Sequence, residues 1–213
     1  MGTYYKNVPD HLDGIDNGDF LEIGVDRGEG STRFFADIAK ERGVKFVGVD
    51  ASPEQIEFAG DRCKHEDGSM LEHVELVSAK GEDYLSQLRD SGSDRKFSMV
   101  YLDNFDWDYW LDVPPEPFVA GAKQYYRDTM GIEMTNLNSQ LTHMIQAVRL
   151  LPFLTPNCLV VCDDTWFEPK EGIFIGKCSA VLPYLIVNGF KLVHNGGYRN
   201  RSGGCGAIMV RSN

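Results

Sequence analysis

The sequence FLEIGVDRGEGS at residues 20–31 determines the fold that we expect for this chain. It begins with an apolar run short enough for a buried strand, continues with three glycines, and reaches Ser31 at the start of an amphipathic segment. This order predicts a strand, a glycine-rich loop and a helix. Glycine suits a backbone with positive φ or one that lies against a ligand, and a helix N-terminus directs free N–H groups towards that ligand. We therefore expect the loop to bind a nucleotide-like ligand.

The residues around the loop narrow the choice of ligand. The loop has neither the Gly-x-Gly-x-x-Gly spacing of dinucleotide sites nor the Gly-Lys-Ser/Thr end of a phosphate loop. Glu22 stands two residues before the first glycine, which favours a cationic ligand over a pyrophosphate. Asp50 ends the next apolar run, where an acid can accept hydrogen bonds from both ribose hydroxyls. The alternative is a tight turn followed by a solvated aspartate.

Together these residues resemble the first two motifs of class I S-adenosylmethionine-dependent methyltransferases. The resemblance implies S-adenosyl-L-methionine as the cofactor. Lys80 stands after the third expected strand, where the family usually carries an acid near the adenine, so its neighbours are the expected adenine contacts. The cofactor-binding residues that the resemblance implies are Glu22, Gly24, Gly28, Gly30, Ser31, Asp50, Ala51, Ala79 and Gly81.

Apolar runs alternate with helical patterns along the whole chain, which predicts a parallel sheet with right-handed crossovers. We expect strands at residues 20–23, 45–50, 74–78, 97–102, 159–162, 190–194 and 207–210. The predicted fold is α/β, a Rossmann-like doubly wound mostly parallel sheet of about seven strands with a C-terminal antiparallel hairpin. We expect one domain over residues 1–213, with an N-terminal arm at 1–18 and a loop or lid insertion at 104–136.

Acidic residues follow the two strands in the middle of this order. Asp103 and Asp106 come after the strand at 97–102, and Asp163 and Asp164 come after the strand at 159–162. Ligands of open parallel sheets bind beyond the carboxyl ends of the strands, so these acids are expected to share a site. Neighbouring carboxylates repel one another unless they are protonated or bridged by a cation. A divalent metal ion bound between the carboxylates is the simplest way to offset their repulsion.

This acid pattern resembles metal-dependent O-methyltransferases of the catechol and macrocin types. The resemblance implies that Asp103, Asp163 and Asp164 hold Mg²⁺, which would bind the acceptor hydroxyl and lower its pKa. Asp106 is the expected general base, so Asp103 and Asp106 are the predicted catalytic residues. The catechol enzyme uses a lysine in this region, whereas this chain has none between Asp103 and Lys123. The alternatives are a strand-end turn at 163–164 and a solvated loop at Asp106.

The insertion contains a proline-rich run at 113–117 and several aromatic residues, which we interpret as a lid or a substrate wall. An oligomer contact is the competing interpretation. The helix that follows has one apolar stripe, which we expect to pack on the sheet: Leu137, Leu141, Met144, Ile145 and Val148. His143 lies on the opposite side of that helix and is expected to face solvent or the lid.

Composition limits the partners. Asp and Glu number 32 against 21 Lys and Arg, and the net charge of −11 repels a phosphate backbone on average. We therefore expect a small-molecule substrate and no nucleic acid, although Arg199 and Arg201 leave a local basic patch open. No apolar run is long enough for a membrane span, and no signal peptide is evident. Five cysteines without a Cys-x-x-Cys pair fit a reducing cytoplasm, and a homo-oligomer is possible.

The sequence thus predicts a methyltransferase that uses a divalent metal to methylate a hydroxyl on a sugar, catechol or natural product. Two alternatives stay open. One is a metal-independent N-, C- or carboxyl methyltransferase, and the other is a non-catalytic nucleotide-binding or assembly module.

Overall fold

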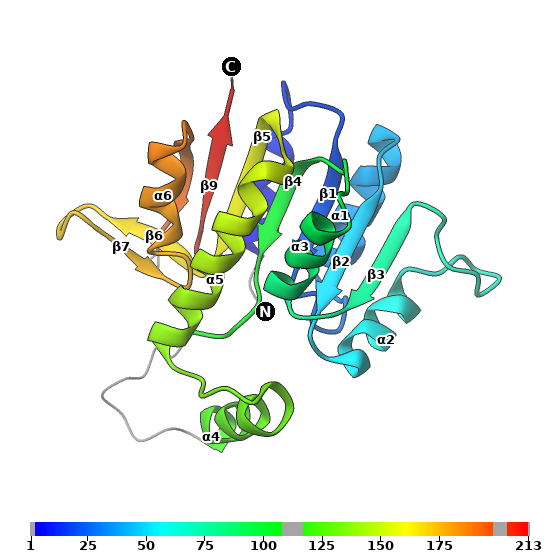
Figure 1. The fold of residues 1–213 in the computed structure, drawn as a ribbon, viewed down its shortest axis with the longest axis horizontal. Helices are drawn as coiled ribbons and strands as arrows, with labels where there is room; N and C mark the ends of the chain where they lie inside the picture. The colour runs from blue at the N-terminus through cyan, green and yellow to red at the C-terminus, as the bar shows by residue number, and fades with distance from the viewer. Residues whose placement is uncertain (1–2, 108–116, 198–203, 213) are drawn as a thin grey trace.

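The computed structural model describes residues 3–107, 117–197 and 204–212. For residues 117–119 it describes the backbone alone. These residues contain a seven-stranded sheet with the order β3-β2-β1-β4-β5-β9-β8 (Figure 1). Strands β1 to β5 are parallel, and β9 runs antiparallel to both β5 and β8. The strand bounds are β1 Asp19–Ile23, β2 Phe46–Asp50, β3 Val74–Ser78, β4 Phe97–Leu102, β5 Leu154–Asp163, β8 Lys191–Gly196 and β9 Gly206–Arg211. The predicted Rossmann-like sheet and its C-terminal hairpin are confirmed.

Helices cover both faces of this sheet. One core lies between the sheet and α3, α5 and α6, and a second lies between the sheet, α1 and the N-terminal segment. The helix bounds are α1 Ser31–Arg42, α2 Pro53–Arg62, α3 Gly81–Asp90, α4 Pro117–Tyr125, α5 Asn136–Leu150 and α6 Val181–Val187. Short helical turns lie at η1 Tyr4–Asn7, η2 Pro9–His11, η3 Tyr126–Met130 and η4 Leu151–Phe153. Each face of the sheet therefore has its own apolar core.

Local sequence signals account for the ends of the first two helices. Gly43 ends α1 with a φ of 68°, a left-handed conformation that glycine adopts without a steric cost. Ser52 caps α2, because its side chain accepts a hydrogen bond from the Gln55 backbone N–H. Pro53 then occupies the first helical turn, where a missing N–H costs nothing.

The described part of the N-terminal arm, residues 3–18, packs against the sheet. Tyr4 is only 1% exposed and lies against Gly196 and Gly206, where any Cβ would collide with its ring. Its hydroxyl shares a 2.8 Å hydrogen bond with His194 Nδ1. Tyr5 packs beside α1 and lines a small cavity next to the glycine loop. The arm is therefore tied to the central sheet and reaches the loop.

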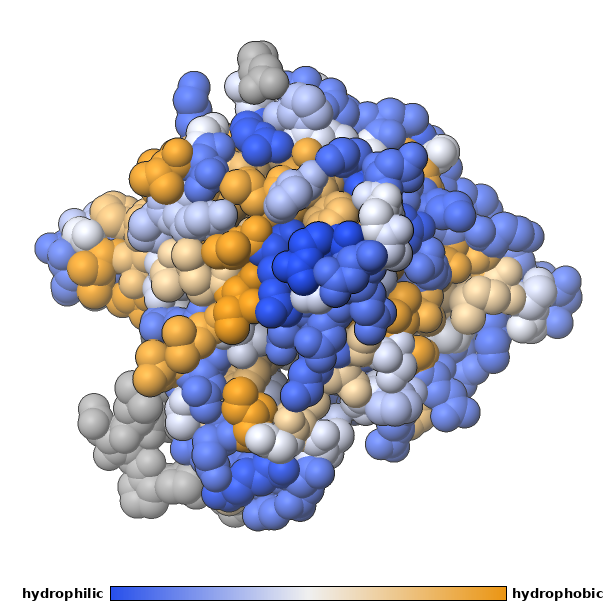
Figure 2. All heavy atoms as spheres, in the orientation of Figure 1, coloured by the Kyte–Doolittle hydropathy of each residue, from blue (hydrophilic) through white to orange (hydrophobic). Residues whose placement is uncertain are grey.

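Helix α5 is placed as predicted, but it presents the opposite face to the core. Figure 2 shows apolar side chains gathered along the outer surface of α5. The exposed residues are Leu137, Leu141, Ile145 and Val148, whereas Met144 is half-buried. The buried side carries Ser139, Thr142, His143 and Gln146. The prediction that the apolar stripe packs on the sheet was wrong.

Polar contacts explain why α5 turns its polar side inwards. Ser139 Oγ donates a hydrogen bond to the Phe105 carbonyl oxygen at 3.0 Å, and Gln146 Nε2 donates to Glu82 Oε2 at 3.1 Å. The helix therefore packs against the loop after β4 and the start of α3, both of which offer hydrogen-bond acceptors. Helical periodicity identifies an apolar stripe but cannot identify which neighbour the helix meets.

His143 is buried in this interface, so its predicted exposure to solvent or to the lid was also wrong. Its Nδ1 lies 2.7 Å from the Ser139 carbonyl oxygen, which fixes Nδ1 as the donor. Burial lowers the pKa of His143 to about 4, so the imidazole is neutral at pH 7. This histidine serves the packing of α5.

A two-stranded sheet that the sequence did not predict follows β5. Strands β6 Thr165–Glu168 and β7 Ile173–Gly176 are antiparallel to each other. Gly176 has a φ of 107°, and a Cβ there would overlap the Asp164 carbonyl oxygen. The missing side chain lets the end of the hairpin lie against the end of β5. The next residue, Lys177, is thereby brought to the carboxyl edge of the main sheet.

The described part of the insertion forms a small lobe. Figure 1 shows α4 beyond the carboxyl ends of the parallel strands. The lobe has its own apolar cluster, in which Phe105, Tyr126 and Met134 are buried. Residues 108–116, which include Tyr109, Trp110 and most of the proline-rich run, lie outside the described residues, as do Arg199 and Arg201.

Candidate active site

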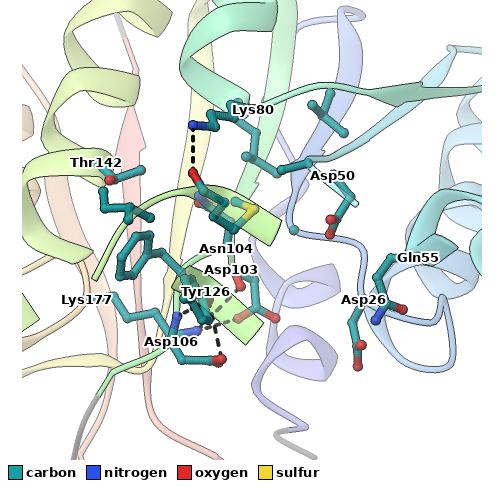
Figure 3. A pocket seen from close by; sticks show the side chains of 18 of the residues that line it. Asp26, Asp50, Gln55, Lys80, Asp103, Asn104, Asp106, Tyr126, Thr142 and Lys177 are labelled. Carbon is teal, nitrogen blue, oxygen red and sulfur yellow. Dashed lines mark hydrogen bonds and ion pairs between the residues drawn. The ribbon is translucent and has the colours of Figure 1, made fainter. Parts of the chain in front are cut away.

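A cavity of about 730 Å³ lies at the carboxyl edge of the sheet, between the strand ends and the α4 lobe (Figure 3). One end is lined by Gly24, Asp50, Ala51 and Gly81, which the sequence assigned to the cofactor. The other end is lined by Asp103, Asp106, Asp163, Asp164 and Lys177. The volume is typical of small-molecule sites. The two groups of predicted site residues therefore share one space.

Asp50 has a fixed orientation at the first end of this cavity. Its Oδ2 accepts a hydrogen bond from the Val25 N–H at 3.1 Å, and its Oδ1 accepts one from the Ser52 N–H at 2.9 Å. Burial raises the pKa of Asp50, and these backbone amides oppose the rise. Each carboxylate oxygen can accept a further hydrogen bond, so the side chain can still receive ribose hydroxyls.

The glycines of the loop have different roles. Gly24 has a φ of 96°, and a Cβ there would lie 2.5 Å from the Asn104 backbone nitrogen, so only glycine lets the two loops meet. Gly28 packs on the Ala59 backbone instead of lining the cavity. Gly30 and Ser31 line a second cavity of about 70 Å³, which also contains Gly24, Asp103 and Asp163.

The residues expected near the adenine lie after β3. Gly81 lines the main cavity, whereas Ala79 packs against the core. Lys80 lines the same cavity, and its Nζ donates a hydrogen bond to the Met130 carbonyl oxygen at 3.2 Å. This lysine therefore connects the cofactor end of the cavity to the insertion lobe.

Glu22 is a fully buried carboxyl group on β1. Among the described residues neither of its oxygens has a hydrogen-bond partner of good geometry. Burial raises the pKa of Glu22 to about 8, although the nearby Ser31 and Thr32 side chains oppose the rise. The side chain is therefore largely protonated at pH 7 and would ionise more readily beside a cationic ligand.

The three acids predicted to bind a metal come together. One carboxylate oxygen from each of Asp103, Asp163 and Asp164 lies within 4.8 Å of the others. Asp163 is buried, and its Oδ1 accepts a 2.8 Å hydrogen bond from the Tyr101 hydroxyl. Burial and the two neighbouring carboxylates raise the pKa of Asp163 well above its usual value. Asp163 therefore holds a proton more tightly than a solvated aspartate does.

Lys177 completes this group, and the sequence reasoning missed it. Its Nζ lies 2.8 Å from Asp103 Oδ1 and 3.2 Å from Asp164 Oδ2, and its side chain is only 3% exposed. The two carboxylates raise the pKa of Lys177 well above its usual value despite burial, so it is charged. In sequence it stands among turn residues, and only the β6–β7 hairpin gives it a place in the site.

Asp106, the predicted base, is exposed and lines the cavity near the same acids. Its backbone N–H donates a 2.8 Å hydrogen bond to the Tyr126 hydroxyl oxygen. Burial raises the pKa of Tyr126, which keeps the phenol neutral. The tyrosine thus ties the loop after β4 to the insertion lobe.

No protein-family model and no curated protein matches this chain significantly. Solved structures share its fold over nearly its whole length. The N-methyltransferase NodS from Bradyrhizobium japonicum is 12% identical with a TM-score of 0.53, and the match covers 99% of this chain and 94% of NodS. CalS11, a TDP-rhamnose 3'-O-methyltransferase, is 14% identical with a TM-score of 0.56 and coverages of 98% and 78%.

A third structure is similar and contains S-adenosylmethionine. The glycopeptide N-methyltransferase MtfA in complex with it is 10% identical to this chain, with a TM-score of 0.53 and coverages of 98% and 87%. At these identities the similarity establishes the fold. The chain has the Rossmann-like fold of S-adenosylmethionine-dependent methyltransferases.

None of the helices in the described residues combines the length and the apolar character that crossing a bilayer requires.

Proposed function

We propose that this protein transfers a methyl group from S-adenosyl-L-methionine to a hydroxyl oxygen of a small molecule. The observation that carries the proposal is the single cavity that joins the Asp50 end to the Asp103 end. Two reacting molecules held in one cavity gain the rate advantage of proximity. The methyltransferase fold supports the choice of cofactor.

Two acids fit this cofactor: Asp50, which lines the cavity, and Glu22, which is buried on β1 and is not among the lining residues. Asp50 offers acceptors to a ribose, and Glu22 is a buried carboxyl group that a positively charged ligand would stabilise in its ionised form. When bound, S-adenosylmethionine supplies an electrophilic methyl carbon on a sulfonium sulfur. The remaining chemistry falls to the residues at the opposite end.

Those residues bind and deprotonate the acceptor. The Lys177 ammonium is a hydrogen-bond donor that can hold the acceptor oxygen, and Asp106 offers an exposed carboxylate that can take the hydroxyl proton. In the transfer the acceptor oxygen forms a bond to the methyl carbon, and the carbon–sulfur bond breaks with its electron pair staying on sulfur. Gly121, Ala122 and Tyr125 of α4 line the same cavity.

Mg²⁺, which the sequence resemblance implies, fits this acid group poorly. The Lys177 ammonium already bonds to Asp103 and Asp164, which are two of the three expected ligands, and Asp163 accepts a hydrogen bond from the Tyr101 hydroxyl. The proposed reaction therefore contains no step through a metal ion.

A second candidate is methylation of an amine. Among the described residues that line the cavity, the acids outnumber the bases by seven to three. The acids are Asp26, Asp50, Glu82, Asp103, Asp106, Asp163 and Asp164, and the bases are Arg27, Lys80 and Lys177. Such a wall attracts a protonated amine. This candidate keeps the cofactor and changes the acceptor atom.

The test is methyl transfer from S-adenosylmethionine with a labelled methyl group to a panel of alcohols, phenols, sugars and amines, with RNA as a further member. We expect labelled product from a hydroxyl compound, and at least a tenfold lower rate for Asp106→Asn. Asp90→Asn, which changes an exposed acid on α3, is the matched control and should leave the rate unchanged. Label only in an amine would select the second candidate, and label only in RNA would overturn both.

A further inference from the structure

The β6–β7 hairpin has a consequence for the chemistry of the acidic site. Gly176 allows the hairpin end to lie against Asp164, and the Lys177 N–H bonds to the Asp164 carbonyl oxygen at 3.3 Å. The Cys178 N–H donates to Thr165 Oγ1 at 2.9 Å on the other side. The backbone of Lys177 is therefore fixed on both sides, and its side chain enters the acid group as a built part of the fold.

The position of the Lys177 ammonium conflicts with a metal ion. Nζ lies 2.8 Å from Asp103 Oδ1 and 3.2 Å from Asp164 Oδ2. A Mg²⁺ ion binds oxygen at about 2.1 Å, so an ion on either of these oxygens would lie within roughly 5 Å of Nζ. Three positive charges would then lie within roughly 5 Å of one another. One cation, and not two, suits this group.

Each of the three carboxyl groups already has a partner in the protein. Asp163 is buried, and its Oδ1 accepts the 2.8 Å hydrogen bond from the Tyr101 hydroxyl. Asp103 and Asp164 are both paired with the Lys177 ammonium. Lysine alone therefore supplies the positive charge that brings these acids together.

We propose that the Lys177 ammonium occupies the cation position of this acidic site, so that the site works without a divalent metal ion and Lys177 itself holds the acceptor oxygen. The second part rests on the proposed function, whereas the first part does not. The ammonium has three N–H groups, and two of them serve Asp103 and Asp164. Nζ also lies 3.5 Å from the Asp103 carbonyl oxygen, a weak contact that an acceptor oxygen can replace.

The first part is tested with Mn²⁺ alone, by electron paramagnetic resonance of the free ion and by calorimetry. We expect no Mn²⁺ binding to the wild-type protein at millimolar ion, and binding at least tenfold tighter in Lys177→Ala. The double variant Lys177→Ala/Asp103→Asn should lose that gain. Thermal melting and circular dichroism establish that each variant is folded. Lys177→Arg, which keeps the charge, should bind no Mn²⁺.

Mn²⁺ binding to the wild-type protein tests the first part even where a variant fails to fold. Mn²⁺ binding by the wild type that Asp103→Asn abolishes would overturn the proposal. So would a folded Lys177→Ala protein that binds no more Mn²⁺ than the wild type. Neither result depends on whether S-adenosylmethionine binds, so this failure is distinct from a failure of the proposed function.

The second part is tested by methyl transfer to the hydroxyl compound that the labelled panel identifies. With excess chelator the wild type should retain its rate. Lys177→Met should raise KM for the acceptor at least tenfold while the dissociation constant for S-adenosylmethionine changes less than twofold. Loss of the rate with chelator, or an unchanged KM in Lys177→Met, would overturn this part.

Discussion

Lys177 Nζ and Asp103 Oδ1 lie 2.8 Å apart, although 74 residues separate them in the chain. This ion pair joins the β6–β7 hairpin to the end of β4 and places a charge inside the cavity. The Lys177 side chain is 3% exposed and that of Asp103 is 29% exposed, so solvent and salt screen this pair less than a pair on the surface. The pair is therefore both an element of the fold and part of the site.

Breaking this pair on one side should be costly. Lys177→Met leaves the Asp103 and Asp164 carboxylates without their cation, and we expect a loss of about 3 to 5 kcal/mol in the free energy of unfolding. Lys177→Met combined with Asp103→Asn should cost less than the sum of the two single changes. Urea denaturation of the four proteins in this cycle measures the coupling. Simple additivity would contradict the assigned pair.

Gly176 should be the glycine of the hairpin least tolerant of a side chain. In Gly176→Ala the new Cβ overlaps the Asp164 carbonyl oxygen, and we expect a loss of at least about 2 kcal/mol in unfolding free energy. Gly172→Ala is the matched control, because its φ of 68° is also positive but no heavy atom lies within 4 Å of the new Cβ. The control should lose only about 1 to 2 kcal/mol. Equal losses in urea denaturation would mean that the close approach is absent.

Glu22 should make stability depend on pH. The pKa of Glu22 is raised from 4.5 to about 8, so the folded protein holds this proton more tightly than the unfolded chain does. The stabilisation is complete below pH 4.5 and is lost as the pH rises towards 8. Relative to Glu22→Gln, the wild type should lose about 1.4 kcal/mol for each pH unit in this window. Parallel stability curves for the two proteins between pH 5 and 8 would refute the buried, protonated state.

The two faces of α5 should respond differently to substitution. Leu141 is 51% exposed, so Leu141→Gln should change the unfolding free energy by less than about 0.5 kcal/mol. Leu150 is 1% exposed, so Leu150→Ala should cost about 2 to 5 kcal/mol. Thermal or urea denaturation measures both changes in unfolding free energy. If the apolar stripe packed on the sheet instead, Leu141→Gln would show the larger loss. A large loss in Leu141→Gln, with the protein monomeric by light scattering, would contradict the observed packing.

The elements that depend on local signals could be predicted from the sequence. The strand at 74–78, the Ser52 cap and the Gly43 stop lie where expected, because each depends on residues within one turn or strand. Convergence of Asp103 and Asp163 also followed from the parallel sheet, since neighbouring strand ends must meet at one edge.

Features that depend on long-range contacts could not be predicted. The outer stripe of α5 has the same periodicity as a buried one, and only the Phe105 carbonyl oxygen in the loop after β4 explains why Ser139 turns inwards. Lys177 carries no local signal, because its place depends on how closely Gly176 approaches Asp164. The metal site was predicted from the three carboxylates alone, because nothing in the sequence indicates that the Lys177 ammonium lies beside them.

Calorimetric titration with S-adenosylmethionine tests the central claim most directly. We predict saturable 1:1 binding by the wild type and weakening by about 1 to 3 kcal/mol in Asp50→Ala, since a charged hydrogen-bond acceptor is lost. Asp90→Ala, on the exposed surface of α3, should bind like the wild type. An unchanged dissociation constant in Asp50→Ala would refute the ribose contact. No detectable binding of S-adenosylmethionine to the wild type would contradict the proposed methyltransferase activity itself.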